Sequence, residues 1–315
     1  MAATDVEVDD QKKIVTVTNG SIINGAQTQG EIRLFLDELA ESGDTEPANF
    51  HARVELMVDP DEAFIVDAAI ARNTSTNIQR ISMAGKKRYF DEINTSFKKV
   101  FPKLELAKAE TDTGDEFVDT LRLLQVLWAL MPEKLLPLGK RSVAEVRLKS
   151  YKNRAFCLVD FERDVLDKDD DQKDPAVRAA AAERYNYMVD MAGVAWKQYQ
   201  KWRHHPEWAG RRLKQSTRAI RRTKTGYTVA DGVIFPILSA MSLFVRKDAS
   251  TPKYHMEVPA VFEEKDIIEA ARDQLSAHDG NPMDMGRNAG VYEAMIMLTR
   301  IVLRVSDRMS HTAAA

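Results

Sequence analysis

The residues best placed for chemistry form a short polar loop, Asn24-Gly25-Ala26-Gln27-Thr28, between a predicted strand and a predicted helix. Thr28, with Glu31 three residues later, forms the capping-box pattern that begins a helix. Backbone amides and the positive end of the helix dipole would then face the loop, an arrangement that binds phosphate and other anions. A purely structural helix cap is the alternative interpretation. The candidate phosphate-binding residues of this loop are Asn24, Gly25, Gln27 and Thr28.

The segments on either side of the loop are the elements that would position it. Ile14–Thr18 alternates apolar and polar residues as a strand does, and Asn19-Gly20 favours a tight hairpin turn into a second strand at Ser21–Ile23. After the loop, Ile32–Leu39 carries apolar residues at helical spacing, which predicts a helix with one buried face. Met1–Lys13 is polar and acidic, and we expect it to be a loose lead-in.

A second polar loop lies further along the chain. His51–Val58 alternates as a half-buried strand does, and Asp59-Pro60 is a strong helix start. That helix is expected to end near Arg72, and another is predicted from Ser82 to Phe97. In the loop between them, Arg80 would supply positive charge to an anion. The candidate ligand-binding residues on this side are Asn73, Asn77 and Arg80.

The rest of the chain has mostly helical spacing of apolar residues. The predicted helices are Phe117–Met131, Val143–Leu158, Ala176–Trp202, Val229–Leu243, Val258–Ala277 and Ala289–Ser306. Asp160–Asp174, between two of them, is expected to be a solvated acidic linker. The sequence therefore predicts an α+β protein, with a small mixed-sheet unit over residues 1–110 and a larger all-helical region over residues 111–315.

One segment, Lys197–Lys224, differs from the rest in composition, and we name it the basic segment. It holds ten lysines and arginines against the single acid Glu207, with Tyr199, Trp202 and Trp208 interleaved. Cations and aromatic rings together suit phosphate backbones and stacked bases. A solvated helix face that packs through its tryptophans is the alternative. The candidate nucleic-acid-binding residues are Lys201, Arg203, Arg211, Arg212, Lys214, Arg218, Arg221 and Arg222.

Composition and motif searches narrow the remaining classes. With 315 residues and a net charge of -3, the chain is neither a wholly basic nucleic-acid coat nor a disordered acidic tail. Its one cysteine, Cys157, excludes an intramolecular disulfide and is expected to be a packed core thiol. No apolar run is long enough to span a bilayer, and residues 1–20 lack the apolar core of a signal peptide. The cytoplasm is therefore the expected location.

Familiar catalytic and metal-binding motifs are missing from the sequence. There is no Walker glycine loop with its lysine, no H-E-x-x-H and no serine elbow. His204-His205 has no second ligand pair, and Asp169-Asp170-Asp171 lacks the glycine and distal glutamate of a calcium loop. No metal site is predicted from these residues. The cofactor stays open, with a nucleotide and Mg²⁺ both compatible with the loops described above.

Ile23-Asn24-Gly25-Ala26-Gln27-Thr28, followed later by an Asn-Thr-rich loop at a helix end, resembles the AIPR family of abortive-infection phage-resistance proteins. In that family an N-G-x-Q-T motif opens a helix, and a T-N-x-Q-N-type segment follows a strand and a helix. More loosely, the order of elements is similar to the ParB-like group, which includes proteins with D-G-Q-H-R motifs in DNA-modification and restriction systems. There the first loop contacts nucleotide phosphates and the second closes over them. The resemblance covers roughly Ile14–Phe97 and implies a ParB-like N-terminal unit.

The resemblance implies a phage-defence protein of the abortive-infection type that binds DNA, RNA or nucleotide phosphate through the Asn24–Thr28 loop. A metal-dependent nuclease or nucleotide hydrolase using the same loops is one alternative. Asn24 stands where the D-G-Q-H-R type has an acid, so activation of a metal or water would have to come from elsewhere. A helical interaction module with a vestigial site is the other alternative. Whether the chain is an enzyme stays open.

Overall fold

A computed structural model of the chain describes residues 2–20, 32, 54–61, 64, 80–109, 111–169, 172–209, 219–224 and 226–313. The chain divides into two compact units, Met1–Gln79 and Arg80–Ala315, and we name the second the helical unit. Helices dominate the described residues, and every sheet among them has two strands. The predicted α+β class is confirmed at this level.

The first unit contains two small sheets. In one, β2 (Asp5–Asp9) pairs antiparallel with β3 (Ile14–Thr18). In the other, β1 (Ala2–Ala3) pairs parallel with β4 (Met57–Val58). The expectation of a loose lead-in over Met1–Lys13 is therefore wrong, because Asp9 caps a turn that folds β2 back onto β3. Its Oδ1 accepts hydrogen bonds from the backbone N–H groups of Gln11 and Lys12, at 3.1 and 3.0 Å.

The strand predicted at His51–Val58 is confirmed only over Met57–Val58, since residues 54–56 are irregular and residues 51–53 lie outside the described part. The second strand of the predicted hairpin, Ser21–Ile23, also lies outside the described part.

The helical unit begins with short elements that pack on its longest helix. α3 (Arg80–Lys86) and α4 (Asp91–Val100) replace the single helix predicted over Ser82–Phe97. The chain breaks there because Arg88 adopts a left-handed backbone, with a φ of 63°. Phe97 is fully buried, and α4 packs against α8 (Pro175–Arg203). These residues therefore belong to the helical unit, whereas the sequence analysis placed the division near residue 110.

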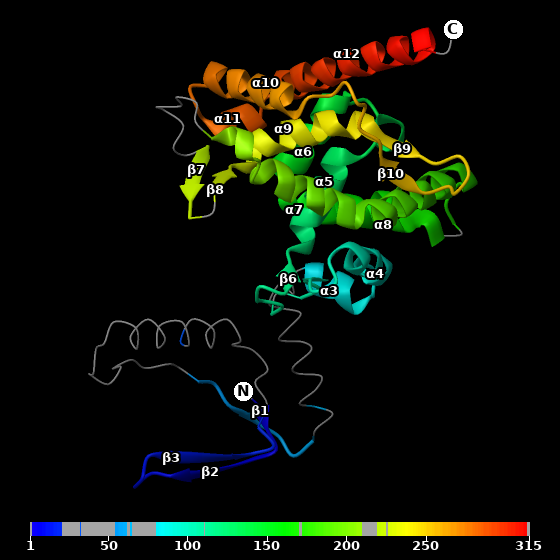
Figure 1. Cartoon of the computed structure of the whole chain (residues 1–315). Helices are drawn as coiled ribbons and strands as arrows, with labels where there is room; N and C mark the ends of the chain where they lie inside the picture. The colour runs from blue at the N-terminus through cyan, green and yellow to red at the C-terminus, as the bar shows by residue number, and fades with distance from the viewer. Residues whose placement is uncertain are drawn as a thin grey trace. The chain divides into compact units, whose positions relative to one another are not determined.

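The remaining helices of the unit form one connected core. They are α5 (Thr120–Leu130), α6 (Val143–Lys152), α7 (Arg154–Asp164), α9 (Asp231–Met241), α10 (Glu264–Ala277), α11 (Pro282–Gly286) and α12 (Ala289–Ala313). Short 3-10 turns lie at Glu133–Leu135, Leu166–Asp169, Pro206–Trp208 and Ser242–Phe244. Figure 1 shows α9, in yellow, between α12 and α8. Every residue of α9 from Gly232 to Met241 is buried, because its sequence is apolar on all sides.

The described residues of the helical unit also form three two-stranded sheets. The prediction of an all-helical region over residues 111–315 is wrong in this detail. The sheets pair β5 (Glu105–Leu106) with β6 (Phe117–Val118), β7 (Ile220–Thr223) with β8 (Gly226–Val229), and β9 (Val245–Lys247) with β10 (Tyr254–Met256). Strands of two to four residues are too short to give a readable alternation.

Two differences concern the segment around α6 and α7. The single helix predicted over Val143–Leu158 is divided at Asn153, whose backbone is extended with a φ of -142°. α7 then continues to Asp164, so the first part of the expected acidic linker is helical. Asp160 is not solvated, because Lys149 Nζ lies 2.7 Å from its Oδ2 and Arg163 Nη2 lies 2.9 Å from its Oδ1. The residues on either side of this break, Lys152 and Arg154, line the pocket described next.

Candidate functional site

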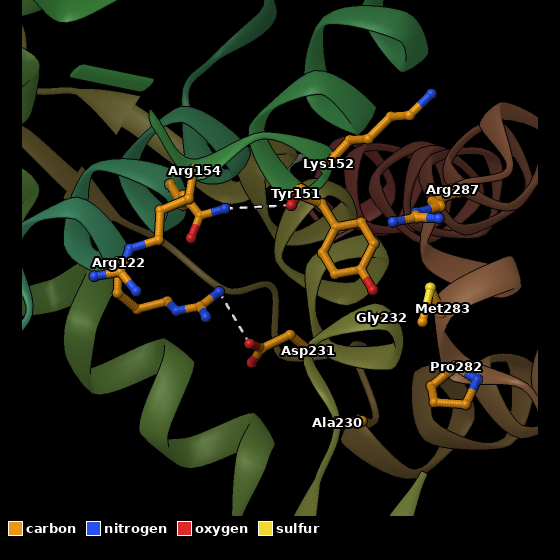
Figure 2. A pocket seen from close by; sticks show the side chains of 11 residues that line it. Arg122, Tyr151, Lys152, Arg154, Ala230, Asp231, Gly232, Pro282, Met283 and Arg287 are labelled. Carbon is orange, nitrogen blue, oxygen red and sulfur yellow. Dashed lines mark hydrogen bonds and ion pairs between the residues drawn. The ribbon is translucent and has the colours of Figure 1, made fainter. Parts of the chain in front are cut away.

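A pocket of about 450 Å³ opens in the helical unit where four elements meet. Its walls come from α5, the junction of α6 and α7, the start of α9, and α11 with the residue that follows it (Figure 2). The residues that line it are Arg122, Gln125, Tyr151, Lys152, Arg154, Ala230, Asp231, Gly232, Pro282, Met283 and Arg287. Four of these side chains are cationic and one is a carboxylate. The pocket is therefore positively charged, although the chain as a whole carries a net charge of -3.

The single carboxylate of the pocket, Asp231, is already engaged. Its Oδ2 lies 2.9 Å from Arg122 Nη1, and its Oδ1 accepts a hydrogen bond of 2.8 Å from the hydroxyl of Tyr199. Arg203 Nη1 donates in turn to the Tyr199 oxygen at 2.9 Å. Burial raises the pKa of Tyr199 to about 12, and the charge of Asp231 adds to the effect, so the phenol stays protonated as a donor. This network ties the start of α9 to α5 and α8.

Two of the four cations are free for a ligand. Arg122 pairs with Asp231, and Arg154 Nη2 lies 2.5 Å from Asp119 Oδ2. Lys152 and Arg287, by contrast, are exposed, and across the described ranges no carboxylate lies within ion-pair distance of either. They come from different elements and both line this pocket, so their charges add there. The Lys152 side chain extends outward from it, away from Asp231 (Figure 2).

Polar groups without charge complete the pocket. Burial, with the charge of Asp231, raises the pKa of Tyr151, so its hydroxyl is a donor at neutral pH. Gln125 Nε2 donates to the backbone oxygens of Ser150, at 2.7 Å, and Tyr151, at 3.3 Å. These two bonds fix the orientation of the amide. Its buried Oε1 has no hydrogen-bond partner within the described part of the chain, which leaves one acceptor unsatisfied.

Of the residues predicted from the two polar loops, the structure describes Arg80 alone, and Arg80 does not line this pocket. Asn24, Gly25, Gln27, Thr28, Asn73 and Asn77 lie outside the described residues. Arg80 begins α3, and its Nη1 lies 3.6 Å from Glu162 Oε2 on the surface of the helical unit. The loops' predicted role in phosphate binding therefore stays a prediction.

The structure describes four of the eight candidate nucleic-acid-binding residues of the basic segment, and two of these four are engaged by other side chains. Lys201 pairs with Glu264, and Arg203 donates to Tyr199. Arg221 and Arg222 are exposed on β7, whereas Arg211, Arg212, Lys214 and Arg218 lie outside the described residues.

The aromatic residues of the basic segment are also unavailable for stacking on bases. Trp202 is fully buried, Trp208 is 2 % exposed, and Trp208 Nε1 donates to the Trp202 carbonyl oxygen at 2.8 Å. Tyr199 is likewise buried. The tryptophans therefore pack in the core, as the alternative interpretation of the segment supposed.

Sequence reasoning missed the pocket because its residues are scattered along the chain. Arg122, Asp231 and Arg287 are more than fifty residues apart from one another, about the length of several elements. The one indication of the pocket in the local sequence was the cluster Tyr151-Lys152-Asn153-Arg154. In the single helix predicted over Val143–Leu158, these four side chains would point in different directions and would not line one pocket.

Comparison with known proteins adds no identification. No family model matches the chain, and no curated protein or solved structure is significantly similar to it.

Among the described residues, no group of three or more His, Cys, Asp or Glu side chains could hold a metal ion. No helix in the described ranges has the length and apolar character needed to cross a membrane.

The engagement of Lys201 leads to a pH-dependent prediction. Glu264 accepts from Lys201 Nζ and lies 2.8 Å from His205 Nε2. Burial acts to raise the Glu264 pKa, but the hydrogen bonds from Lys201 and His205 outweigh it and hold the pKa below its usual 4.5. Because the folded-state pKa is depressed, this contribution to stability is complete above about pH 4.5 and is lost as pH falls through the folded-state pKa.

We therefore expect Glu264→Gln to lower the melting temperature at pH 7 by about 1 to 3 °C, since the pair is partly exposed. The variant should also lose less stability than the wild type between about pH 5 and pH 3. Thermal melts across this range, followed by circular dichroism, measure both effects. Parallel acid-dependence in the two proteins would show that Glu264 is not coupled to Lys201 and His205 in this way.

Proposed function

We propose that this chain binds phosphate groups of nucleic acid or of a nucleotide at the pocket between α5, the α6–α7 junction, α9 and α11. The observation that carries the proposal is the pair Lys152 and Arg287, two exposed cations that share one pocket and have no carboxylate partner among the described residues. Arg122 and Arg154 also line the pocket, but their charges are paired with Asp231 and Asp119. Guanidinium and ammonium groups converging on one cavity are the usual protein ligands of phosphate.

The uncharged groups favour a nucleotide over inorganic phosphate. Tyr151 offers a hydroxyl donor to a phosphate oxygen. Gln125 Oε1 is a buried acceptor in the pocket wall with no partner among the described residues, and in this proposal the ligand brings a donor to that wall. A sugar hydroxyl or a base amino group supplies such a donor, and a fully ionised phosphate does not. The raised pKa of Tyr151 suits hydrogen-bond donation better than proton abstraction, so binding is proposed in preference to catalysis.

The wider role proposed is that of a phage-defence protein of the abortive-infection type. Its support is the N-G-x-Q-T resemblance at Asn24–Thr28, with the ParB-like N-terminal unit that the resemblance implies. In this proposal the Asn24–Thr28 loop would contact phosphate in the first unit, and the basic pocket would contact phosphate in the helical unit. The enzymatic alternative would need the loops of the first unit to activate a metal or water.

A double substitution tests the basic pocket. Lys152→Ala with Arg287→Ala is expected to weaken binding of a fluorescent single-stranded hexanucleotide at least tenfold, measured by anisotropy at about 50 mM salt. Each lost phosphate contact also lowers the slope of log affinity against log salt by about 0.7, so the slope should fall by about 1.4.

Lys253→Ala with Lys265→Ala is the matched control, because it removes the same charge from exposed lysines that do not line the pocket. We expect it to change affinity less than threefold. Equal losses in the two double variants would mean that only overall charge is sensed, and the proposal would then fail.

A further inference from the structure

A second pocket, of about 510 Å³, lies on the other side of the α6–α7 junction. It shares Lys152 and Arg287 with the first pocket, so these two cations stand at the divide between them. The junction itself forms the divide: Tyr151 and Arg154 line the first pocket, and Asn153 lines the second. A phosphate held at the divide would therefore have one pocket on each side.

The second pocket differs in chemistry from the first. Phe156 in the first turn of α7 is 44 % exposed and lines it together with the half-buried Leu148. The ammonium of Lys149 lies 5.2 Å from the centre of the Phe156 ring and is held in place by Asp160. Lys149 lies over one face of the ring, and the exposed remainder of the ring is a platform on which a nucleic-acid base can stack.

The second pocket has one carboxylate, Glu145, and its lining also includes the cations Arg141 and Lys149. Glu145 is engaged in a capping box at the start of α6, where its Oε2 accepts the Ser142 backbone N–H at 2.6 Å. It stays ionised, because the Ser142 hydrogen bonds hold its pKa below the usual 4.5. An ionised carboxylate in the same pocket as Phe156 and Leu148 is an acceptor for a hydrogen bond from a neutral base.

We propose that the two pockets bind adjacent nucleotides of one single strand, with the linking phosphate at Lys152 and Arg287 and one base stacked on Phe156. This proposal rests on the proposed function, because it needs phosphate at the divide. It adds that the ligand is a strand of at least two nucleotides and not a free mononucleotide. Each pocket has a volume in the range that holds a molecule of nucleoside size.

A length series of competitors tests the strand proposal. The competitors displace the fluorescent hexanucleotide from the protein, and the displacement gives the affinity of each one. They are thymidine 5′-monophosphate, the dinucleotide pTpT and the two corresponding uridine ligands. The wild type is expected to bind the dinucleotide at least tenfold more tightly than the mononucleotide, since one stacked base has about that effect. The relative affinities of the thymidine and uridine ligands separate DNA from RNA.

Phe156→Ala should reduce this preference to less than threefold and leave mononucleotide affinity within twofold of the wild type. Phe156→Trp should preserve the preference, because a larger ring still stacks. Val177→Ala, which shortens an exposed apolar side chain of α8 outside both pockets, is the control and should change neither affinity. Melting curves of all variants confirm that the fold is retained.

The outcomes separate the two proposals. If Phe156→Ala weakens both ligands equally, or leaves the preference for the dinucleotide intact, the strand proposal is wrong and the proposed function still stands. A wild type that binds neither the oligonucleotides nor the mononucleotides would overturn the proposed function and the strand proposal together.

Discussion

Alanine at position 232 is expected to lower the free energy of unfolding of the helical unit by about 2 to 3 kcal/mol, the upper end of overpacking effects. A Cβ on Gly232 would lie 1.7 Å from the backbone carbonyl oxygen of Pro282, in α11. A backbone atom cannot rotate away as the end of a side chain can. The approach is close from both sides, because a Cβ on Gly286 would lie 2.6 Å from the Gly232 Cα.

The same substitution should also abolish ligand binding. To accept the new methyl group, α11 has to move away from the start of α9. α11 carries Met283, and Arg287 directly follows it, so one wall of the pocket would move with it. Urea denaturation and hexanucleotide anisotropy, measured on the same preparation, report the two losses.

Gly290→Ala is the control, because its Cβ would meet only the side chain of Asn288, at 3.2 Å. Gly290 lies in the first turn of α12, where alanine is the better helix former, so we expect stability to be unchanged or slightly raised. If both variants unfold at the wild-type urea concentration, close packing of α9 on α11 is not required.

The long helices were predictable because local signals and packing agree in them. Asp174 followed by Pro175 predicts a helix start, and in the structure Asp174 Oδ1 accepts the Ala176 N–H at 2.7 Å. The predicted helix over Ala176–Trp202 is therefore confirmed as α8. α9 likewise follows an apolar run that is buried throughout, and α12 begins with residues that are buried on one face, such as Val291, Tyr292 and Met295.

Two breaks inside predicted helices were missed. Gly85 precedes the first of them by three residues, but a single glycine within a helical pattern does not by itself end a helix. Arg88 has a left-handed backbone, although the sequence around it reads as continuous helix. It is stabilised by contacts that depend on the fold: Arg88 Nε donates to Asp91 Oδ2 at 2.7 Å, and Asp91 Oδ1 accepts from Lys108 at the same distance. Asn153 ends α6 in a similar way, without a local marker.

The sequence predicted the chemistry of the candidate site, cations that bind phosphate, but not which residues form it. Sequence reasoning expected cations arranged for phosphate, and it looked for them where they are densest, in the basic segment. Density along the chain does not measure availability, however, because Lys201 is engaged by Glu264 while Lys152 is free among the described residues. Only the fold determines which cation has a carboxylate neighbour.

Removal of the Arg147 side chain is expected to have the other large effect on stability. Arg147, on α6, is 1 % exposed, and its Nη1 and Nη2 donate to the backbone oxygens of Ala129 and Met131, the second at 2.8 Å. These carbonyls lie at the end of α5, where helical partners are missing and a cation is favoured by the helix dipole. Burial lowers the pKa of Arg147 to about 10, so the guanidinium is still charged at neutral pH.

Arg147→Ala should cost about 3 kcal/mol or more, because two buried carbonyls lose their donors and a cavity is left. Arg147→Met fills most of the volume and introduces no charge, so its cost should be about 1 to 2 kcal/mol, the part due to the lost hydrogen bonds. Arg304→Ala, at an exposed position of α12, should stay within about 0.5 kcal/mol of the wild type. Equilibrium unfolding in urea gives the three values.

The relative stabilities of Arg147→Ala and Arg147→Met show whether Arg147 acts through its hydrogen bonds. Arg147 joins α6 to the end of α5, and these helices bring Tyr151 and Lys152 against Arg122. If Arg147 acts by satisfying the carbonyls, methionine is intermediate in stability and the affinity for the hexanucleotide falls in the same order. If Arg147→Met is instead as stable as the wild type or more stable, burying the charge of Arg147 destabilises the fold by more than its hydrogen bonds stabilise it. The role of Arg147 would then be to position α6 beside the pocket.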